Sequence, residues 1–183
     1  MTRVRQNRWR AIVFVLLPAL AIAARAAQPE ATVAGIEAAF LYNFSKFIEW
    51  PDGTPTTASD SFLMCVTGDS SVQQSLEEIA ATRTINGRRI TLKHLKIADS
   101  ARSCQILFVG PKERASLTRI LQDLQGASVL TVGISEDFAK DGGMIGFVLD
   151  ADRVRFVVNA GAAGKARLKV SSKLLSLAIA VEK

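Results

Sequence analysis

The 183-residue chain has few of the residues from which catalytic and metal centres are usually built. It contains one histidine, His94, and two cysteines, Cys65 and Cys104. A tetrahedral zinc site needs two ligands more than the cysteines supply, so no metal is expected. No serine or cysteine nucleophile is signalled beside His94, which shares a strand phase with Ile90 and Leu92 and is expected to be a core or edge residue. The chain is therefore not expected to be an enzyme, and no cofactor is expected.

A nucleotide-binding loop is also missing. The segment "NAGAAGKA" (159–166) follows an expected strand and opens an expected helix, which is the right context for a phosphate loop. Its spacing is wrong, because only two residues separate Gly161 from Gly164 and an alanine follows Lys165. A flexible turn is expected here, with a weaker anion site as the alternative.

No apolar run reaches the roughly 20 residues of a stable membrane anchor. The run from Ala11 to Ala24 has fourteen residues, follows four arginines and precedes the small-x-small sequence Ala24-Arg25-Ala26. This plan is typical of a secretory signal peptide. We expect residues 1–26 to be a cleaved signal peptide and residues 27–183 to form a periplasmic domain, with an uncleaved anchor as the alternative.

An excess of basic charge is confined to that first segment. The whole chain has 23 Lys+Arg against 17 Asp+Glu, but residues 1–26 hold five arginines and no acid, which leaves 18 against 17. The expected mature protein is nearly neutral, so its charge gives no reason to expect nucleic-acid binding.

The two cysteines form an even pair in an expected exported protein, which favours a disulfide between Cys65 and Cys104. In the chain-entropy description, closing a loop of about 40 residues stabilises a fold by roughly 4 kcal/mol.

Hydrophobic periodicity predicts alternating strands and helices that end in a hairpin and a helix. Helices are expected over 31–50, 71–81, 111–125 and 166–181, and strands over 62–66, 89–95, 104–110 and 128–134, with a hairpin over 142–159. The predicted fold class is α/β: a single compact domain with a mixed β-sheet flanked by helices and a C-terminal β-hairpin plus helix.

The stretch "FLYNFSKFIEWP" (40–51) combines aromatic residues with a terminating proline. Placed on a helix, six apolar residues of this region share one arc and are expected in the core: Val33, Ile36, Phe40, Phe44, Phe47 and Ile48. Glu37 lies inside the same arc, without an explanation from the pattern. Four other residues are candidates for a partner- or ligand-binding surface: Tyr42, Asn43, Lys46 and Trp50. Packing at the helix end is the alternative for Trp50.

Two further segments supply candidates. In "DGGMIGF", Gly143 and Met144 belong either to a glycine loop that a ligand approaches or to a turn into the hairpin. Gly146 indicates a bulge or a close backbone contact. In "SSK", Ser172 and Lys173 form either an exposed pair near a pocket or polar decoration of the last helix.

These blocks together resemble the YfiR-like family of exported bacterial regulators. The likeness runs over essentially the whole expected mature chain, in the order "FLYNFSKFIEWP", "LMCVTGD", "INGRRITLKHL", "CQILFVG", "VLTVGISEDFAKDGGMIGFVLDADRVRFVVN" and "VSSKLLSLA". The resemblance implies a periplasmic α/β domain without catalytic activity, and Cys65 and Cys104 match the family's disulfide.

The resemblance also implies a function. The protein is expected to bind the periplasmic sensor part of an inner-membrane diguanylate cyclase and to repress it. Repression would restrain cyclic di-GMP signalling and biofilm formation. A homodimer and an outer-membrane lipoprotein antagonist are further partners that it implies. The alternative from another class is a periplasmic small-molecule sensor or carrier, whose ligand lies under Tyr42, Trp50 and the glycine segment.

Overall fold

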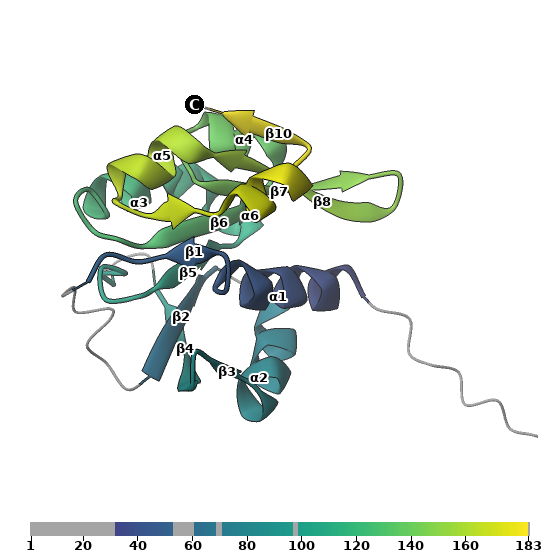
Figure 1. Cartoon of the computed structure of the whole chain (residues 1–183), viewed down its shortest axis with the longest axis vertical. Coiled ribbons are helices and arrows are strands. Elements are labelled where there is room, and N and C mark those ends of the chain that lie inside the picture. The colour runs from purple at the N-terminus through teal and green to yellow at the C-terminus, as the bar shows by residue number, and fades with distance from the viewer. Residues whose placement is uncertain (1–31, 53–60, 69–70, 97–98, 183) are drawn as a thin grey trace, which may run out of the picture. The chain divides into compact units, whose positions relative to one another are not determined.

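The computed structural model describes residues 32–52, 61–68, 71–96 and 99–182 (Figure 1). The expected signal peptide, residues 1–26, lies outside the described residues. All the elements below belong to one compact unit, residues 31–183.

The secondary structure alternates strands with short helices. The helices are α1 (Val33–Phe44), α2 (Val72–Thr82), the 3₁₀ helix η1 (Pro111–Ser116), α3 (Leu117–Asp123), α4 (Glu136–Lys140), α5 (Ala160–Lys165) and α6 (Ser172–Leu177). The strands are β1 (Ile48–Glu49), β2 (Ser61–Thr67), β3 (Thr84–Ile85), β4 (Arg88–Leu95), β5 (Ile106–Val109), β6 (Leu130–Ile134), β7 (Ile145–Asp150), β8 (Arg153–Asn159), β9 (Lys169–Val170) and β10 (Ala180–Glu182).

Among the described residues, eight strands form one mixed sheet in the order β10-β8-β7-β6-β5-β2-β4-β3. Five neighbouring strands, β4, β2, β5, β6 and β7, run parallel. The hairpin partner β8 is antiparallel to β7, as the sequence predicts, and β10 adds parallel to β8. A second, two-stranded sheet pairs β1 with β9. The predicted mixed α/β fold is confirmed.

The sheet has an apolar layer on each face because its central strands are buried on both sides. One layer packs the sheet against α1, α2 and α6 through residues such as Phe44, Leu76 and Leu174. The other contains the cysteines and packs the sheet against α3 and α4, through Ile120 and Phe138. The aromatic rings of Phe44 and Phe147 stack with centroids 5.8 Å apart, which fixes α1 on the hairpin.

The first helix is shorter than predicted. It ends at Phe44 rather than near residue 50, because Ile48 and Glu49 extend to pair with Val170 and Lys169. Within the predicted apolar arc, Phe44 and Ile48 are buried, whereas Val33 is 49% exposed, so its assignment to the core was wrong. The pairing partner lies more than a hundred residues away, beyond the reach of local periodicity.

The single helix predicted over 166–181 was also wrong. The helix α5 begins earlier, because the side chain of Asn159 accepts a hydrogen bond from Ala162 N at 2.7 Å and caps it. Arg167 then adopts φ +61° and ends that helical segment. The remaining residues form β9, α6 and β10, whose partners are distant strands.

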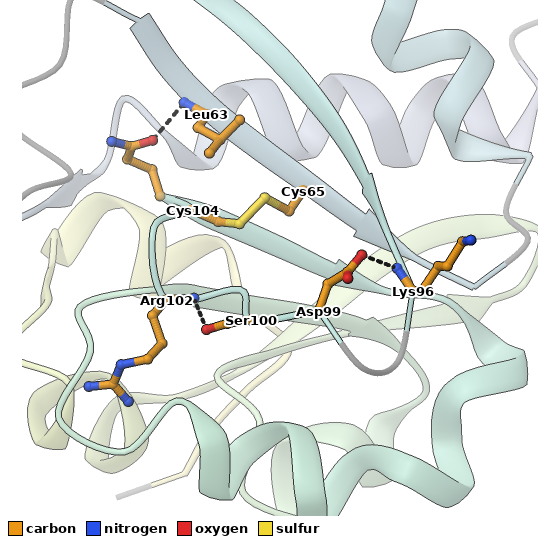
Figure 2. The surroundings of a disulfide bond; sticks show 8 residues. Leu63, Cys65, Lys96, Asp99, Ser100, Arg102 and Cys104 are labelled. Carbon is orange, nitrogen blue, oxygen red and sulfur yellow. Dashed lines mark hydrogen bonds between the residues drawn. A yellow bond between two sulfur atoms is a disulfide. The ribbon is translucent and has the colours of Figure 1, made fainter.

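The predicted disulfide is present between Cys65 of β2 and Cys104, which lies just before β5 (Figure 2). The two Cα atoms are 6.0 Å apart, and both residues are buried. Next to the bond, Gln105 Oε1 accepts a hydrogen bond from Leu63 N at 2.6 Å. The disulfide therefore ties β2 to the segment that leads into the neighbouring parallel strand β5.

Candidate functional site

Tyr42, near the C-terminal end of α1, is the centre of a cationic cluster. Its half-buried ring lies beneath the ammonium of Lys46, 4.0 Å from the centroid, and beside the guanidinium of Arg83 at 5.4 Å. The Tyr42 hydroxyl donates to Thr84 O at 3.3 Å, and Lys46 Nζ donates to Asn43 Oδ1 at 3.4 Å. We call these four side chains, Tyr42, Asn43, Lys46 and Arg83, the α1 surface. It presents two positive charges on an ordered aromatic platform.

Trp50 lines a pocket beside β3. The pocket measures about 260 Å³ and is lined by Ile48, Glu49, Trp50, Phe62, Asn86, Arg88 and Gln105. The indole packs edge-on against Phe62, with centroids 5.4 Å apart. Its Nε1–H is buried and has no hydrogen-bond partner in the described part of the chain, whereas a buried indole N–H usually has one. Trp50 is thus a packing residue that also offers a donor.

The predicted Ser172–Lys173 pair comes close to the end of α1. Pairing of β1 with β9 brings the start of α6 beside Phe47, and Ser171 N donates to Phe47 O at 3.0 Å. The Lys173 ammonium lies 5.6 Å from the Phe47 ring centroid, and both Ser172 and Lys173 are exposed. The last helix therefore adds a third cation near the C-terminal end of α1.

Gly143 and Met144 are buried where the chain enters the hairpin. A Cβ on Gly143 would lie 2.1 Å from Cε1 of Phe138, so this position needs glycine for close packing. Met144 is buried, and its N–H donates to Thr131 Oγ1 at 3.1 Å. Gly142, just before them, has a φ of +101°, which suits a turn into the hairpin, whereas Gly143 does not have a positive φ.

Met144 also lines a groove of about 390 Å³ between α3 and α5, together with Lys165. The segment 159–166, predicted to be a flexible turn, is the capped helix α5. Asn159 is fully engaged there, since its Nδ2 donates to Ala139 O at 2.8 Å. The side chain of Asn159 therefore serves the local structure of this groove.

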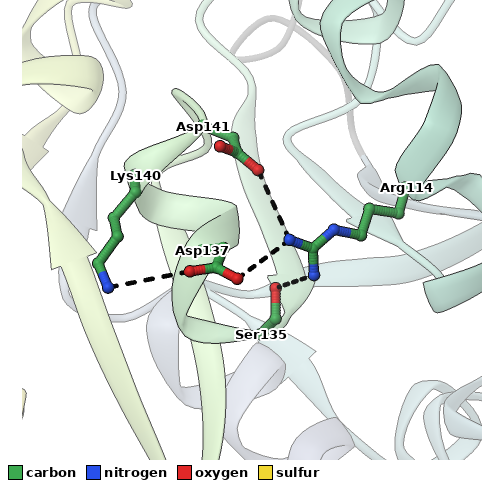
Figure 3. A network of polar contacts seen from close by, with 5 residues as sticks. All are labelled: Arg114, Ser135, Asp137, Lys140 and Asp141. Atoms are coloured by element: carbon green, nitrogen blue, oxygen red, sulfur yellow. Dashed lines mark hydrogen bonds and ion pairs between the residues drawn. The ribbon is translucent and has the colours of Figure 1, made fainter.

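At the carboxyl edge of β5 and β6, where open α/β sheets commonly bind ligands, a polar network fills the space. Arg114 pairs with Asp137 at 3.1 Å and donates to Ser135 Oγ at 3.3 Å, and Lys140 lies 3.9 Å from Asp137 (Figure 3). The hollow beside Arg114 measures about 10 Å³, room for about one water. These half-exposed ion pairs join the loops after β5 and β6.

Glu37, unexplained by the sequence pattern, is 5% exposed on the core side of α1. Burial raises the pKa of this carboxyl to about 7, because desolvation disfavours the ionised form. Among the described residues, Glu37 is the one titratable group whose pKa is shifted strongly by its environment.

Sequence reasoning missed the contributions of Arg83 and Arg88. Arg83 follows α2, and Arg88 lies 5.5 Å from the Phe62 ring centroid beside Trp50. Both come from the segment "ATRTINGRR", whose hairpin turn is readable but whose proximity to α1 depends on tertiary packing. The described residues contain no group of three or more His, Cys, Asp or Glu side chains placed to hold a metal.

Comparison of the chain with protein families tests the family resemblance that the sequence motifs suggest. The model of the YfiR/HmsC-like family matches residues 34–179, which covers the described helices except for Val33, the first residue of α1. The chain belongs to the YfiR/HmsC-like family. Membership places the chain in a family that is regulatory rather than catalytic.

One solved structure supports the fold. A crystal structure of a conserved domain protein from Vibrio cholerae O1 biovar El Tor matches with a TM-score of 0.60 and 11% identity, covering 82% of this chain and 60% of that one. The chain thus spans about three fifths of that protein's length. An ABC domain from Streptococcus pneumonia, crystallised with L-Trp, matches with a TM-score of 0.49 and 13% identity over 66% of this chain and 55% of that one. The search of curated proteins found no match.

A last observation concerns membranes. None of the helices in the described ranges combines the length and apolar character that a bilayer crossing requires.

Proposed function

We propose that this protein acts in the periplasm, after cleavage of residues 1–26, by binding the periplasmic region of an inner-membrane diguanylate cyclase and repressing it. Family membership supports this proposal, and so does the disulfide, which is typical of exported proteins. The role needs no catalytic group. A homodimer and an outer-membrane lipoprotein that relieves repression belong to the same proposal.

The α1 surface is the observation that carries the proposal of a binding site. Tyr42 is held by its hydroxyl, and Lys46 and Arg83 lie over its ring, so the platform is ordered before a partner arrives. Tyrosine and arginine are enriched where protein interfaces gain most of their affinity. The positive charge of this surface fits an acidic face on the partner, which would speed association and select against basic surfaces.

The test is capture of the cyclase from membranes. Purified protein beginning at Ala27 would be immobilised and incubated with detergent-solubilised inner membranes of the source organism, followed by mass spectrometry. We expect the wild-type protein to enrich a diguanylate cyclase. Charge reversal by Lys46→Glu or Arg83→Glu should reduce the captured amount by roughly tenfold or more, since a charge pair across an interface becomes a repulsion.

Arg119→Glu provides the matched control, because Arg119 is an exposed arginine on α3, away from the α1 surface. It should capture as much cyclase as the wild type, and all three variants should melt normally because surface substitutions change stability little. In cells, Lys46→Glu should raise cyclic di-GMP while Arg119→Glu should not. Equal capture by all variants would move the interface elsewhere, and enrichment of no cyclase would reject the proposed function.

The Trp50 pocket favours a second candidate, a small-molecule sensor or carrier. The observation that favours this function is the buried indole N–H of Trp50, which has no acceptor in the described part of the chain and lies beside the polar side chains of Arg88 and Gln105. A ligand with a hydrogen-bond acceptor and an apolar body fits such a wall. Native mass spectrometry of protein isolated from the periplasm would show a bound mass that Trp50→Phe reduces, if this function holds.

A further inference from the structure

A second hollow lies at the other end of α1, away from Trp50. It measures about 270 Å³ and is lined almost wholly by apolar residues: Val33, Ala34, Glu37, Ser71, Ile134, Phe147, Val148, Leu149 and Val154. Three of the large apolar side chains in this wall remain exposed, namely Val33 at 49%, Ile134 at 37% and Leu149 at 61%. A hollow of this size, apolar and reachable from solvent, suits a small organic molecule.

Glu37 is the unusual member of this wall. It is 5% exposed, and it has no hydrogen bond or ion pair in the described part of the chain. A buried carboxyl without a partner is costly, and proteins seldom retain one where an apolar residue would pack as well. The neighbours Ala38 and Leu41 on the same helix are fully buried and apolar, so the site could have been filled without an acid.

We propose that this hollow binds a small protonated amine with a short apolar body, and that the carboxylate of Glu37 is its counter-ion. The apolar wall would cover the body of the ligand, and the ring of Phe147 offers a surface for an aromatic one. The ammonium would give Glu37 the charged hydrogen-bond partner that the protein itself does not supply. The site is independent of the α1 surface and of the proposed partner.

Among the described residues, no other charged side chain lines the hollow with Glu37. Glu37 is the one titratable residue in the lining. From α2, Val72 and Leu76 are turned into the core, whereas Glu77 and Glu78 are exposed. On β8, Val154 lines the hollow, and Arg153 and Arg155 alternate with it, so they point to the opposite face of the sheet. Asp150, at the end of β7, is exposed and outside the lining.

Calorimetric titration with 2-phenylethylamine and with its neutral analogue 2-phenylethanol tests the proposal. At pH 8 the wild-type protein should bind the amine at least about tenfold more tightly than the alcohol, because a charge-assisted hydrogen bond is added. Lowering the pH to 5 protonates Glu37 and should weaken amine binding by about tenfold or more, while alcohol binding stays unchanged. The amine itself remains protonated throughout this range.

Glu37→Gln keeps the shape of the side chain and removes its charge. It should abolish both the preference for the amine and the pH dependence, whereas Glu77→Gln, on exposed α2, should preserve both. Ile134→Trp fills the hollow from its rim and should weaken both ligands without touching Glu37. The proposal is overturned if the amine binds no better than the alcohol, or if Glu37→Gln binds the amine as the wild type does. Failure here would leave capture of a cyclase by the α1 surface unaffected.

Discussion

At the scale of single residues, the carboxyl group of Glu37 makes the stability of the fold depend on pH. Its pKa is raised from 4.5 to about 7 by burial. Below pH 4.5 the folded and unfolded chains both hold the proton. Between these two values the unfolded chain releases it and the folded chain keeps it, so the free energy of unfolding falls as the pH rises. Above pH 7 the loss levels off at no more than roughly 3 kcal/mol, because solvent in the hollow screens part of the charge.

Glu37→Gln should remove this dependence. At pH 5 the variant and the wild type should unfold at closer temperatures than at pH 8, because both side chains are neutral in the folded protein there. At pH 8 the variant should be the more stable protein by up to roughly 3 kcal/mol, since it avoids burying a charge. Thermal melts followed by circular dichroism at both pH values measure the difference. A wild-type protein that gains stability from pH 5 to pH 8 relative to the variant would contradict this.

The same residues show how far the sequence leads toward the site. The helix pattern separates Phe44, which is buried, from Lys46, which is exposed, because side-chain burial follows the period of the helix. It marks Glu37 as anomalous without explaining it. Arg83 could not be assigned to the α1 surface, because its approach to Tyr42 depends on how α2 and β3 pack against α1.

At the scale of elements, α4 depends on two glycines around Phe138. A Cβ atom added to Gly133 would lie 2.3 Å from Cδ2 of Phe138, and one added to Gly143 would lie 2.1 Å from Cε1 of the same ring. These glycines belong to β6 and to the turn before β7, so the ring fills the space between two parallel strands and their connecting helix. An added methyl group has no free volume there.

Gly143→Ala should destabilise the protein by about 1–3 kcal/mol, because Phe138 or the strand must move. Gly164→Ala is the control: no atom lies within 4 Å of its Cβ position, and it is within α5. That substitution should stabilise by up to about 1 kcal/mol through helix propensity. Urea titrations of both variants give the two free energies. Equal changes in the free energy of unfolding for the two variants would show that Gly143 is not required for the close packing around Phe138.

Element boundaries separate what local sequence determines from what it does not. The strands β5, β6, β7 and β8 are found from their apolar runs, since burial on the sheet is visible in each segment alone. The short strands β1, β9 and β10 are two or three residues long and exist because distant segments pair with them. The local pattern of these residues predicts helix. They form strands only because the completed sheet offers them pairing partners.

At the scale of the whole molecule, the order of the strands makes the disulfide central. In the sheet, β2 lies between β4 and β5. The connection that follows β4 in the chain must therefore cross from one side of β2 to the other before β5 begins. Cys104 ends that crossing, and its bond to Cys65 ties the crossing to the middle of the sheet. The cysteine pair and the fold class could both be predicted from the sequence. The strand order could not, because parallel neighbours carry no local signal of which strand they adjoin.

Replacing both cysteines, Cys65→Ser with Cys104→Ser, should lower the free energy of unfolding by roughly 4 kcal/mol, the loop-closure value for a bond spanning 39 residues. For a domain of this size the melting temperature should fall by roughly 10 °C. Two buried hydroxyls add their own cost, so the variant alone does not isolate the cross-link. Wild-type protein melted in reductant does isolate it, because both sulfur atoms stay in place.

The comparison of the two melts then separates structure from function. Reduced wild-type protein should melt below the oxidised protein and at or slightly above the serine variant. If the bond acts only through stability, reduced protein held well below its melting temperature should still capture the cyclase, because the α1 surface lies on the other apolar layer from the cysteines. Its abundance in the periplasm should nevertheless fall, as destabilised proteins are degraded. Loss of capture by fully folded, reduced protein would instead make the disulfide a redox control of the binding surface.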